Sequence, residues 1–339
     1  MRLLALLLLS TVGLAQRAPG NPLEHLPKNI EVLTHFGERA DVSPDNQRVA
    51  FMTKSFGDAM VIDLKTRVIQ CLTCNVPATA FLRVMHLVTG DYILIGPDHF
   101  ENVHISRTRD NELSFLSKER GAKPVKLGQK MSEGAAISKK TLKIAFSQTV
   151  AQSADVGPEA SRLIVADLDL SGPPKLVNQK TVYESKDRNC VIEAQDFYDN
   201  DTKMTFTCYD NHDMKTKAEQ YALVMGIDLK TDKVTDFIQS KDTYNEVEGI
   251  FPDGKYAAVE GDRHVAQAGG KHGNMNLDLY KLRLDGTGND FVRLTHFNEY
   301  EGFKAANPVV STDGKFMAFQ IGRSGEEAGV GYGIVMMHF

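Results

Sequence analysis

Arg293–Phe339, which begins RLTHF and continues through STDGKFMAFQ to GYGIVMMHF, is the stretch that decides the fold of this chain. Its parts follow the same order as those of Val32–Lys65, which begins VLTHF and continues through SPDNQRVAFM to AMVIDLK. Each copy has an LTHF segment, a spacer, a Ser-x-Asp-Gly/Asn turn, an alternating apolar strand, a loop and a second apolar strand. A weaker third copy, IFPDGKYAAVEGD, spans Ile250–Asp262. A unit that recurs every few tens of residues is typical of a repeat architecture.

The whole chain divides into six such units, each with three or four short alternating strands separated by Asp, Gly or Asn turns. Their predicted bounds are Asp41–Cys71, Phe81–Leu127, Ser132–Val177, Cys190–Phe237, Glu246–Phe297 and Lys304–Phe339. The last unit is one strand short, and Ile30–Phe36 is one strand too many at the start. We therefore predict an all-β, six-bladed β-propeller in which Ile30–Phe36 completes the last blade beside Gly331–Phe339. Such closure leaves no open sheet edge, whereas a sandwich or a solenoid does not explain the complementary ends.

The beginning of the chain has the pattern of a secretory signal peptide. Arg2 is followed by a short apolar core, Leu3–Leu9, and by small residues at the −3 and −1 positions of a cleavage site after Ala15. The alternative is a buried N-terminal segment. The predicted division of the chain is a signal peptide over 1–15, a linker over 16–30 and a single propeller domain over 31–339. We expect an exported protein, secreted or periplasmic, with no membrane span.

The charge of the chain argues against a nucleic-acid partner. The net charge over 339 residues is −5 and no basic block is present, whereas binding to nucleic acid depends on neutralising phosphates. The four cysteines of an exported chain favour disulfides. Cys71 and Cys74 form a CLTC motif, and Cys190 and Cys208 lie on neighbouring predicted strands. A redox or metal role for CLTC lacks the βαβ context or the second ligand pair that it would need.

Candidate chemistry gathers on one predicted face of the propeller. The loops that precede the innermost strands share a face with the loops between second and third strands, and polar residues there converge on a mouth. The sharpest candidate is the region around VEGIFPDGKYAAVEGDRH, in which Glu246 and Glu248 alternate on one strand and Glu260–His264 ends the next. A carboxylate near a histidine can act as a general base, and Arg263 can hold an anion. In the alternative, Glu248 is a solvated turn residue and Arg263 belongs to a surface ion pair.

A second candidate is the stretch HFNEYEGFKAANP before and within the innermost strand of the last blade. Asn307 precedes a proline and is therefore expected to be extended. In the alternative, these residues satisfy backbone donors of the loop. The predicted catalytic residues are Glu248, His264 and Glu193, and the predicted substrate-binding residues are Glu246, Arg263, Glu301, Lys304, Asn307 and Arg323.

A third candidate, His99–His104, offers two histidines and Glu101 to a metal ion, but its spacing matches no established motif and favours a solvated loop. We therefore predict no metal site and no cofactor. The sequence has no G-x-S-x-G nucleophile motif.

The SPDN, FPDG and STDG turns, each followed by an AF or AV strand, resemble the WD40-like PD40 repeats of TolB-type β-propellers. The resemblance covers Val32–Phe339 and is strongest in the first, fifth and sixth units, because the second and fourth have TGD and YDND turns instead. CLTC, VEGIFPDGKYAAVEGDRH and FKAANPVVSTDGKFMAFQIGRS also resemble an exported subgroup that includes the propeller protein of fungal trichothecene clusters. That resemblance implies cyclisation or tailoring of a small terpenoid-like molecule.

Three functions are therefore open. The first is a secreted or periplasmic propeller that binds a small molecule at its loop-face mouth, with a possible role as a tailoring enzyme (cyclase- or isomerase-like) of secondary metabolism that needs no redox cofactor. The second is a non-catalytic protein-interaction scaffold of the TolB type. The third is a metal-dependent polysaccharide lyase, which the sequence disfavours: oligogalacturonate-lyase-type propellers have paired histidines before the inner-strand proline, and this chain has Ala305-Ala306-Asn307-Pro308 there. We expect a monomer with a small-molecule or protein partner at the loop face.

Overall fold

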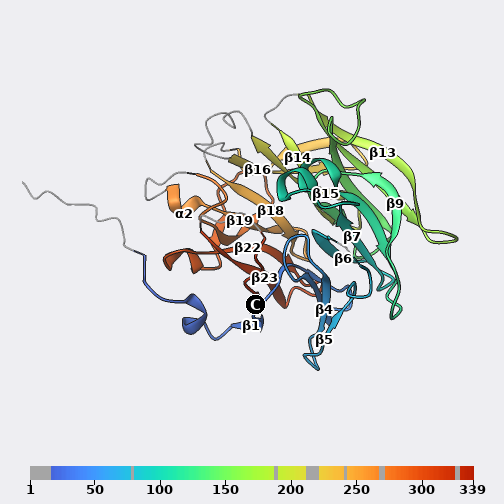
Figure 1. Cartoon of the computed structure of the whole chain (residues 1–339). Coiled ribbons are helices and arrows are strands. Elements are labelled where there is room, and N and C mark those ends of the chain that lie inside the picture. The colour runs from blue at the N-terminus through green and yellow to red at the C-terminus, as the bar shows by residue number, and fades with distance from the viewer. Residues whose placement is uncertain are drawn as a thin grey trace, which may run out of the picture.

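Six four-stranded antiparallel sheets form the blades of a β-propeller. The computed structural model describes residues 17–77, 80–186, 190–210, 221–239, 243–266, 272–324 and 329–339, so the predicted signal peptide lies outside the described residues. The blades follow one another in chain order around a central axis (Figure 1). The prediction of a six-bladed, ring-closed propeller is confirmed.

The strands of each blade run in sequence from the axis outward. The first three blades contain β2 (Glu38–Val42), β3 (Arg48–Met52), β4 (Ala59–Asp63) and β5 (Ile69–Cys71); β6 (Arg83–His86), β7 (Tyr92–Gly96), β8 (Glu112–Leu116) and β9 (Val125–Lys130); and β10 (Ala135–Ile137), β11 (Lys143–Thr149), β12 (Ser161–Asp169) and β13 (Lys175–Ser185). The other three contain β14 (Val191–Tyr198), β15 (Lys203–Asp210), β16 (Tyr221–Asp228) and β17 (Lys233–Asp236); β18 (Asn245–Ile250), β19 (Tyr256–Gly261), β20 (Asp278–Arg283) and β21 (Phe291–Arg293); and β22 (Phe303–Val310), β23 (Phe316–Arg323), β24 (Ile334–His338) and the N-terminal β1 (Ile30–Thr34).

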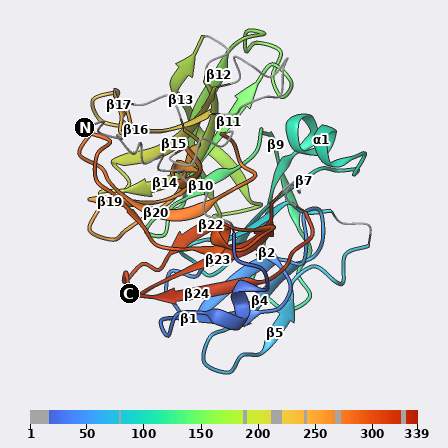
Figure 2. The ribbon, with the colours of Figure 1, turned by 90° about the vertical axis from the view of Figure 1, so that its left-hand side faces the viewer.

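The two ends of the chain lock the ring. β1 pairs with β24 in antiparallel register, with Ile30 opposite Met337 and Val32 opposite Val335, and the two strands lie side by side in Figure 2. Just beyond β1, the N–H of Gly37 donates to the carbonyl of Gly331 at 3.0 Å. The outermost strand of the sixth blade therefore comes from the start of the chain, as predicted.

The repeated turns have one shared geometry that explains their sequence. Asn46, Gly254 and Gly314 have positive φ angles of 58°, 66° and 70°, and the N–H of each donates to a carbonyl three residues earlier at 2.8–2.9 Å. Glycine and asparagine tolerate this left-handed conformation better than other residues do, so the turn keeps one of these two residues where the chain reverses.

The hydrophobic core lies between neighbouring blades. One cluster, for example, joins Ala136 and Leu163 of the third blade to Met204 and Phe206 of the fourth. Each large side chain buried in this way contributes about 1.5–3 kcal/mol. Because the apolar faces of the sheets are used between blades, the innermost strands are left to line the axis.

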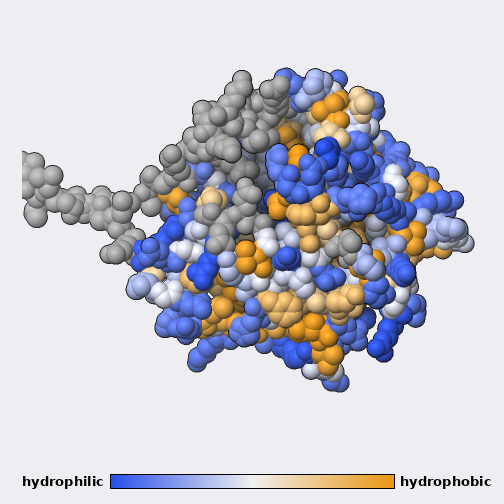
Figure 3. Space-filling model, in the orientation of Figure 1, coloured by the Kyte–Doolittle hydropathy of each residue, from blue (hydrophilic) through white to orange (hydrophobic). Residues whose placement is uncertain are grey.

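Short helices occupy some of the connections. They are η1 (Pro22–His25), α1 (Val103–Ile105), the π-helical η2 (Ser106–Asp110), α2 (Arg263–Ala266) and η3 (Phe297–Glu299). The predicted linker is attached to the propeller, because Ala18 forms a bridge with Tyr300. None of the helices in the described part of the chain has the length and hydropathy to cross a membrane. The surface in Figure 3 mixes hydrophilic side chains with separate hydrophobic patches.

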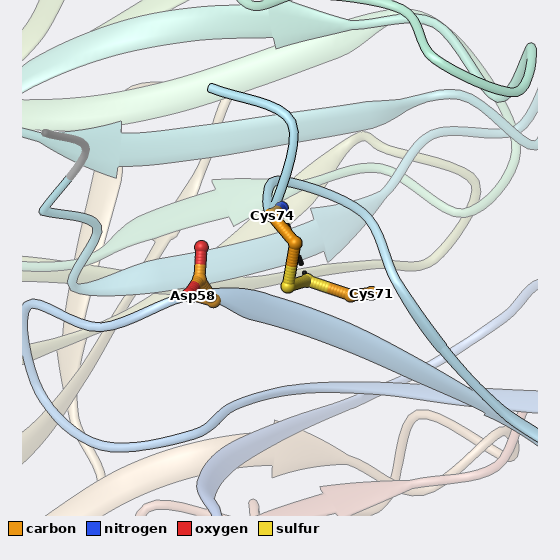
Figure 4. Close-up of side chains that lie close together, drawn as sticks. All are labelled: Asp58, Cys71 and Cys74. Atoms are coloured by element: carbon orange, nitrogen blue, oxygen red, sulfur yellow. Dashed lines mark hydrogen bonds between the residues drawn. A yellow bond between two sulfur atoms is a disulfide. The ribbon is translucent and has the colours of Figure 1, made fainter. Parts of the chain in front are cut away.

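The four cysteines form two disulfides, which agrees with the expectation that they favour disulfides. Cys190 is bonded to Cys208, and Cys71 is bonded to Cys74. Figure 4 shows the carboxylate of Asp58 beside the second bond. Because the two sulfurs are joined to each other, they are not thiolate ligands for a metal, and Asp58 instead accepts a hydrogen bond from the hydroxyl of Thr73 at 2.8 Å.

Candidate functional site

Two cavities lie along the axis of the propeller. The loop-face cavity, of about 340 Å³, is bounded by groups that include Arg107, Glu133, Tyr244, Glu260 and Lys304. The turn-face cavity, of about 210 Å³, is bounded by groups that include Ala40, Met85, Ile137, Phe197 and Val309. Arg39, Arg83 and Asn307 line both cavities, so we call these three residues the septum.

The innermost strands change character along the axis. Five of them, and the segment that leads into β10, carry a charged residue nearer the loop-face end and an apolar residue further along the chain toward the turn face. The pairs, in chain order, are Arg39 and Ala40, Arg83 and Met85, Glu133 and Ile137, Glu193 and Phe197, Glu248 and Ile250, and Lys304 and Val309. Apolar side chains are therefore added to the axis toward the turn face, where Asp41, Lys139 and Asp196 also line the cavity.

Glu133 is an ionised carboxylate held by arginines. It contacts the guanidinium of Arg107, and its Oε1 lies 3.4 Å from Nη2 of Arg39. Burial alone would raise the pKa of Glu133, but the charges of Arg107 and Arg39 lower it to about 2. The side chain of Glu133 is 21% exposed, so this carboxylate faces the loop-face cavity in its charged form.

Arg83 holds two carboxyl groups that come from different blades. Its Nη2 lies 3.0 Å from Oε1 of Glu193, and its Nη1 lies 3.8 Å from Oε2 of Glu248. Burial raises the pKa of Glu193 to about 8, with help from the charges of Glu133 and Glu246, and Arg83 only partly opposes this. Burial and the charge of Glu246 raise the pKa of Glu248 well above its usual range. The Glu248 side chain is 4% exposed, which excludes the alternative of a solvated turn residue.

The contacts of the Tyr209 hydroxyl indicate independently that Glu193 or Glu246 is protonated. The hydroxyl of Tyr209 lies 2.8 Å from Oε2 of Glu193 and also contacts Oε1 of Glu246. The hydroxyl of Tyr244 contacts the other oxygen of Glu246. A phenol has one hydrogen to donate, and an ionised carboxylate has none. If both contacts of Tyr209 are hydrogen bonds, one of the two carboxyl groups carries its own proton, in agreement with the raised pKa of Glu193.

Three glutamates meet beside the septum. Oxygen atoms of Glu246, Glu248 and Glu260 lie within 4.8 Å of one another. Asn307 organises two of them, because its backbone N–H donates to Glu260 at 2.6 Å and its side-chain amide donates to Glu248 at 2.7 Å. Burial, followed by the charges of Glu246 and Glu248, raises the pKa of Glu260 well above its usual range. The trio is the only group of potential metal ligands besides Asp58, Cys71 and Cys74 that the described residues form.

The expectation of an extended Asn307 is wrong. Its φ is +49°, in the left-handed region, although it precedes Pro308. The pairing of β22 with β23 shifts register between Ala306 and Val309, which marks a bulge at this point. The bulge directs the backbone N–H of Asn307 to Glu260 and its side-chain amide to Glu248. Strained backbone conformations of this kind are common at functional sites.

His264 is placed away from the glutamates. Its Nδ1 lies 2.9 Å from the hydroxyl of Tyr280, and its Nε2 lies 3.0 Å from Oδ1 of Asn298. Both partners belong to outer parts of the fifth and sixth blades, and His264 lines neither cavity. Burial lowers the pKa of His264. The structure therefore brings Glu248 close to Glu193 through Arg83 but does not add His264 to them.

The predicted substrate-binding residues are divided between the cavity walls and the surface. Glu246, Lys304 and Arg323 line the loop-face cavity, and Asn307 lines both cavities. Lys304 donates to the carbonyl of Asn274 at 2.9 Å, and the guanidinium of Arg323 lies 3.8 Å from the ring centre of Phe303.

The other two predicted substrate-binding residues do not line either cavity. Arg263 lies 3.9 Å from the ring centre of Phe291, and Glu301 is exposed. Of the two histidines and Glu101 of the third candidate, only His104 lines the loop-face cavity, while Glu101 pairs with Arg109 at 3.0 Å.

Four residues of the site escaped prediction: Arg83, Arg107, Tyr209 and Tyr244. Arg83 left a signal in the sequence, because it interrupts the apolar strand FLRVMHLV and a charge in an innermost strand must face the axis. Tyr209 and Tyr244 have no such signal in the sequence, since tyrosine is common in strands. Arg107 lies in η2, within the connection between β7 and β8, and the sequence does not reveal the course of that connection.

Comparison with known proteins establishes the fold alone. Solved structures that are similar include a putative TolB from Agrobacterium tumefaciens, at 13% identity and a TM-score of 0.52 over 82% of this chain and 96% of that one. An oligogalacturonate lyase in complex with manganese is 11% identical, with a TM-score of 0.51 over 89% and 77% of the two chains. The RRP9 WD40 repeats are 9% identical, with a TM-score of 0.52 over 91% and 97%. The sequence matches no protein-family model and no curated protein.

These similarities bear out the resemblance to TolB-type and WD40-like propellers. They do not confirm the narrower resemblance to the propeller protein of trichothecene clusters. At such low identity they carry no information about the ligand, because unrelated functions share one fold.

Proposed function

We propose that this propeller binds a small molecule in its loop-face cavity and acts on it by proton transfer, as an isomerase, cyclase or lyase. The observation that supports the proposal most is the coexistence of proton-rich and ionised carboxyl groups at one site. Glu260, on the wall of the loop-face cavity, has a raised pKa, whereas the pKa of Glu133 on the same wall is about 2. Groups whose pKa values are pushed apart in one cavity are the usual basis of acid and base roles.

In the proposed reaction Glu260 donates a proton to an oxygen atom of the substrate, and Glu133 accepts a proton from another atom of the same molecule. The substrate keeps its electrons, so the step needs no oxidant or reductant. Exchange with water restores both carboxyl groups. Glu193 does not line the cavity, and its role is to supply protons to Glu246 through Tyr209, with which both carboxyl groups are in contact.

The arginines provide the binding component. The Nε atoms of Arg39, Arg83 and Arg107 are buried and have no hydrogen-bond partner among the described residues. All three arginines also line the loop-face cavity, so the other guanidinium nitrogens can donate to acceptor oxygens of a ligand. A hydroxylated or carbonyl-bearing molecule suits such donors.

Product formation from metabolite extracts tests this function. Wild type and the isosteric variants Glu260→Gln and Glu133→Gln are incubated with extracts of the producing organism, and mass spectrometry follows new products. We expect turnover in wild type and about 100-fold less or lower in both variants, the usual size of a lost acid or base. Glu119→Gln, at an exposed position, is the matched control and keeps full activity.

Binding without turnover would contradict the enzymatic proposal. If the wild-type protein retains a small molecule from the extract and forms no product, the non-catalytic binding role is correct. If it retains only another protein, the scaffold role is correct.

We also propose that the protein is exported and works as a monomer. Its two disulfides are compatible with a secreted or periplasmic location. Mass spectrometry of the secreted protein is expected to find Gln16 as the first residue and both bonds intact. A protein that keeps residues 1–15 and four free thiols would contradict export.

A further inference from the structure

The turn-face cavity has features of a separate ligand site that the acid–base proposal does not use. Its volume is about 210 Å³. For scale, an apolar cavity of about 150 Å³ in another protein admits benzene. The turn-face cavity therefore has room for a compact molecule larger than one six-membered ring.

Apolar side chains from all six blades contribute to the walls of this cavity. Each of the six innermost strands contributes at least one apolar side chain to it. These side chains are Ala40, Met85, Ile137, Phe197, Ile250 and Val309. Apolar surface that a ligand buries against such walls contributes about 25 cal/mol per Å², so an apolar body is favoured here over a sugar-like one.

The polar groups around the cavity are already paired with one another. Nζ of Lys139 lies 2.7 Å and 2.9 Å from the two carboxylate oxygens of Asp41. Arg83 lies between Glu193 and Glu248. Asp196 accepts a hydrogen bond from the N–H of Ile250 at 3.1 Å, and burial raises its pKa to about 7. Lys139 and Arg83 are therefore already neutralised by carboxyl groups, and Lys140 is held by a neutral group, because its Nζ donates to Oδ1 of Asn200 at 2.8 Å.

A neutral hydrogen-bonding group would find partners at the inner end of the same cavity. Glu248 and the septum residues Arg83 and Asn307 all reach its wall. A hydroxyl or ketone oxygen can accept from arginine or from an amide, and a hydroxyl can also donate to a carboxyl oxygen.

We propose that the turn-face cavity binds a compact, uncharged, mostly apolar molecule with one hydroxyl or ketone group directed at the septum. The ligand reaches its site from the face opposite the loop-face mouth. This binding does not depend on the acid–base function, because the two cavities share only the septum.

Three probes with one apolar body and different head groups test the proposal. They are 1-adamantanol, adamantane-1-carboxylate and 1-adamantylamine, measured by calorimetry and by saturation-transfer NMR at a pH of about 6. We expect the alcohol to bind and both charged analogues to bind at least tenfold more weakly.

Two filling variants locate the site. Val309→Phe and Ala40→Leu enlarge partly buried side chains that line the cavity, and each is expected to weaken binding of the alcohol at least tenfold. Two variants are used because one of them could fail to fold, which circular dichroism would reveal. Val68→Phe, at a position that is 55% exposed, makes the same exchange as Val309→Phe and is expected to bind as wild type does.

Several outcomes would overturn the proposal. Failure of 1-adamantanol to bind wild type would remove the site. Equal binding in folded Val309→Phe and Ala40→Leu would place the probe elsewhere on the molecule. Equal binding of all three probes would show that the head group is not recognised. None of these outcomes concerns turnover, so the acid–base function is tested separately from the turn-face site.

Discussion

The loop-face and turn-face halves of the axis are built from the same six innermost strands, but buried charges dominate the first and apolar side chains are added in the second. The loop-face half contains Arg83, Glu133, Glu193 and their partners, whose charges have lost most of their contact with water. Apolar side chains from all six blades contribute to the walls of the turn-face half. Buried ion pairs are no more stabilising than well-packed apolar residues of the same size. The buried charges of the loop-face half are therefore better explained by a function than by stability. The apolar side chains of the turn-face half are explained by the shape of the cavity that they form.

The largest effect is expected when the central cation of the loop-face half is removed. Arg83→Met leaves Glu193, which is partly ionised at a pH of about 8, buried without its counter-charge. We expect it to lower the free energy of unfolding by about 3–5 kcal/mol, the usual cost of breaking a buried pair. Urea unfolding at a pH of about 8 measures this cost.

An exposed arginine provides the control for that experiment. The pair of Arg67 and Glu31 has side chains that are 44% and 39% exposed, and such pairs contribute about 1 kcal/mol or less. Arg67→Met is therefore expected to have a small effect. Equal losses of unfolding free energy in Arg83→Met and Arg67→Met would show that Arg83 stabilises the protein no more than an exposed arginine does.

The second effect is a pH dependence that belongs to the loop-face half. The pKa of Glu193 is raised from 4.5 to about 8 in the folded protein, so the folded state binds more protons than the unfolded state between these values. Stability linked to Glu193 is fully present below a pH of about 4.5 and is lost as the pH rises to 8. Glu193→Gln is expected to remove at least about 1.4 kcal/mol of this slope, the equivalent of one pKa unit. Thermal unfolding across the range measures it, and an unchanged slope would contradict the protonated Glu193.

The third effect concerns the bulge where the two halves meet. Asn307→Ala and Asn307→Gly both lose the hydrogen bond to Glu248, but only glycine adopts a φ of +49° without a steric penalty. We expect the alanine variant to be less stable than the glycine variant by about 1 kcal/mol. Chemical unfolding of the two proteins gives the difference, and equal stabilities would mean that the left-handed backbone is not retained.

The smallest effect is expected in the turn-face half. Val309 is only partly buried, so Val309→Ala should cost less than about 1 kcal/mol. Because no titrating group is lost, the cost should be the same at every pH. A cost that varied with pH would mean that the two halves are coupled more strongly than their shared septum suggests.

The fold could be predicted because its signals are local. The turns at Ser43–Asn46 and Ser311–Gly314 and the alternation in the strands after them lie within a dozen residues of sequence. The pairing of β1 with β24 could also be predicted. The last blade lacks one strand and the start of the chain has one strand too many, so the extra strand completes the last blade.

The site could be predicted only in part, since its contacts join distant blades. Glu248 and Glu193 were identified, but the bond that connects them runs through Arg83, which is 110 residues away from Glu193. His264 seemed close to Glu248 because both lie at ends of neighbouring strands. The chain after β19 instead turns toward Tyr280, on the third strand of the blade. Which way a chain leaves a strand is decided by tertiary packing, and the sequence pattern does not contain that information.

Infrared spectroscopy of carboxyl groups tests the central claim most directly. In wild type at a pH of about 7, we predict a band from protonated carboxyl groups. The part of the band that comes from Glu193 disappears as the pH passes about 8, and this part is missing in Glu193→Gln but unchanged in Glu119→Gln. A spectrum with only ionised carboxylates at that pH would contradict the proton-sharing site.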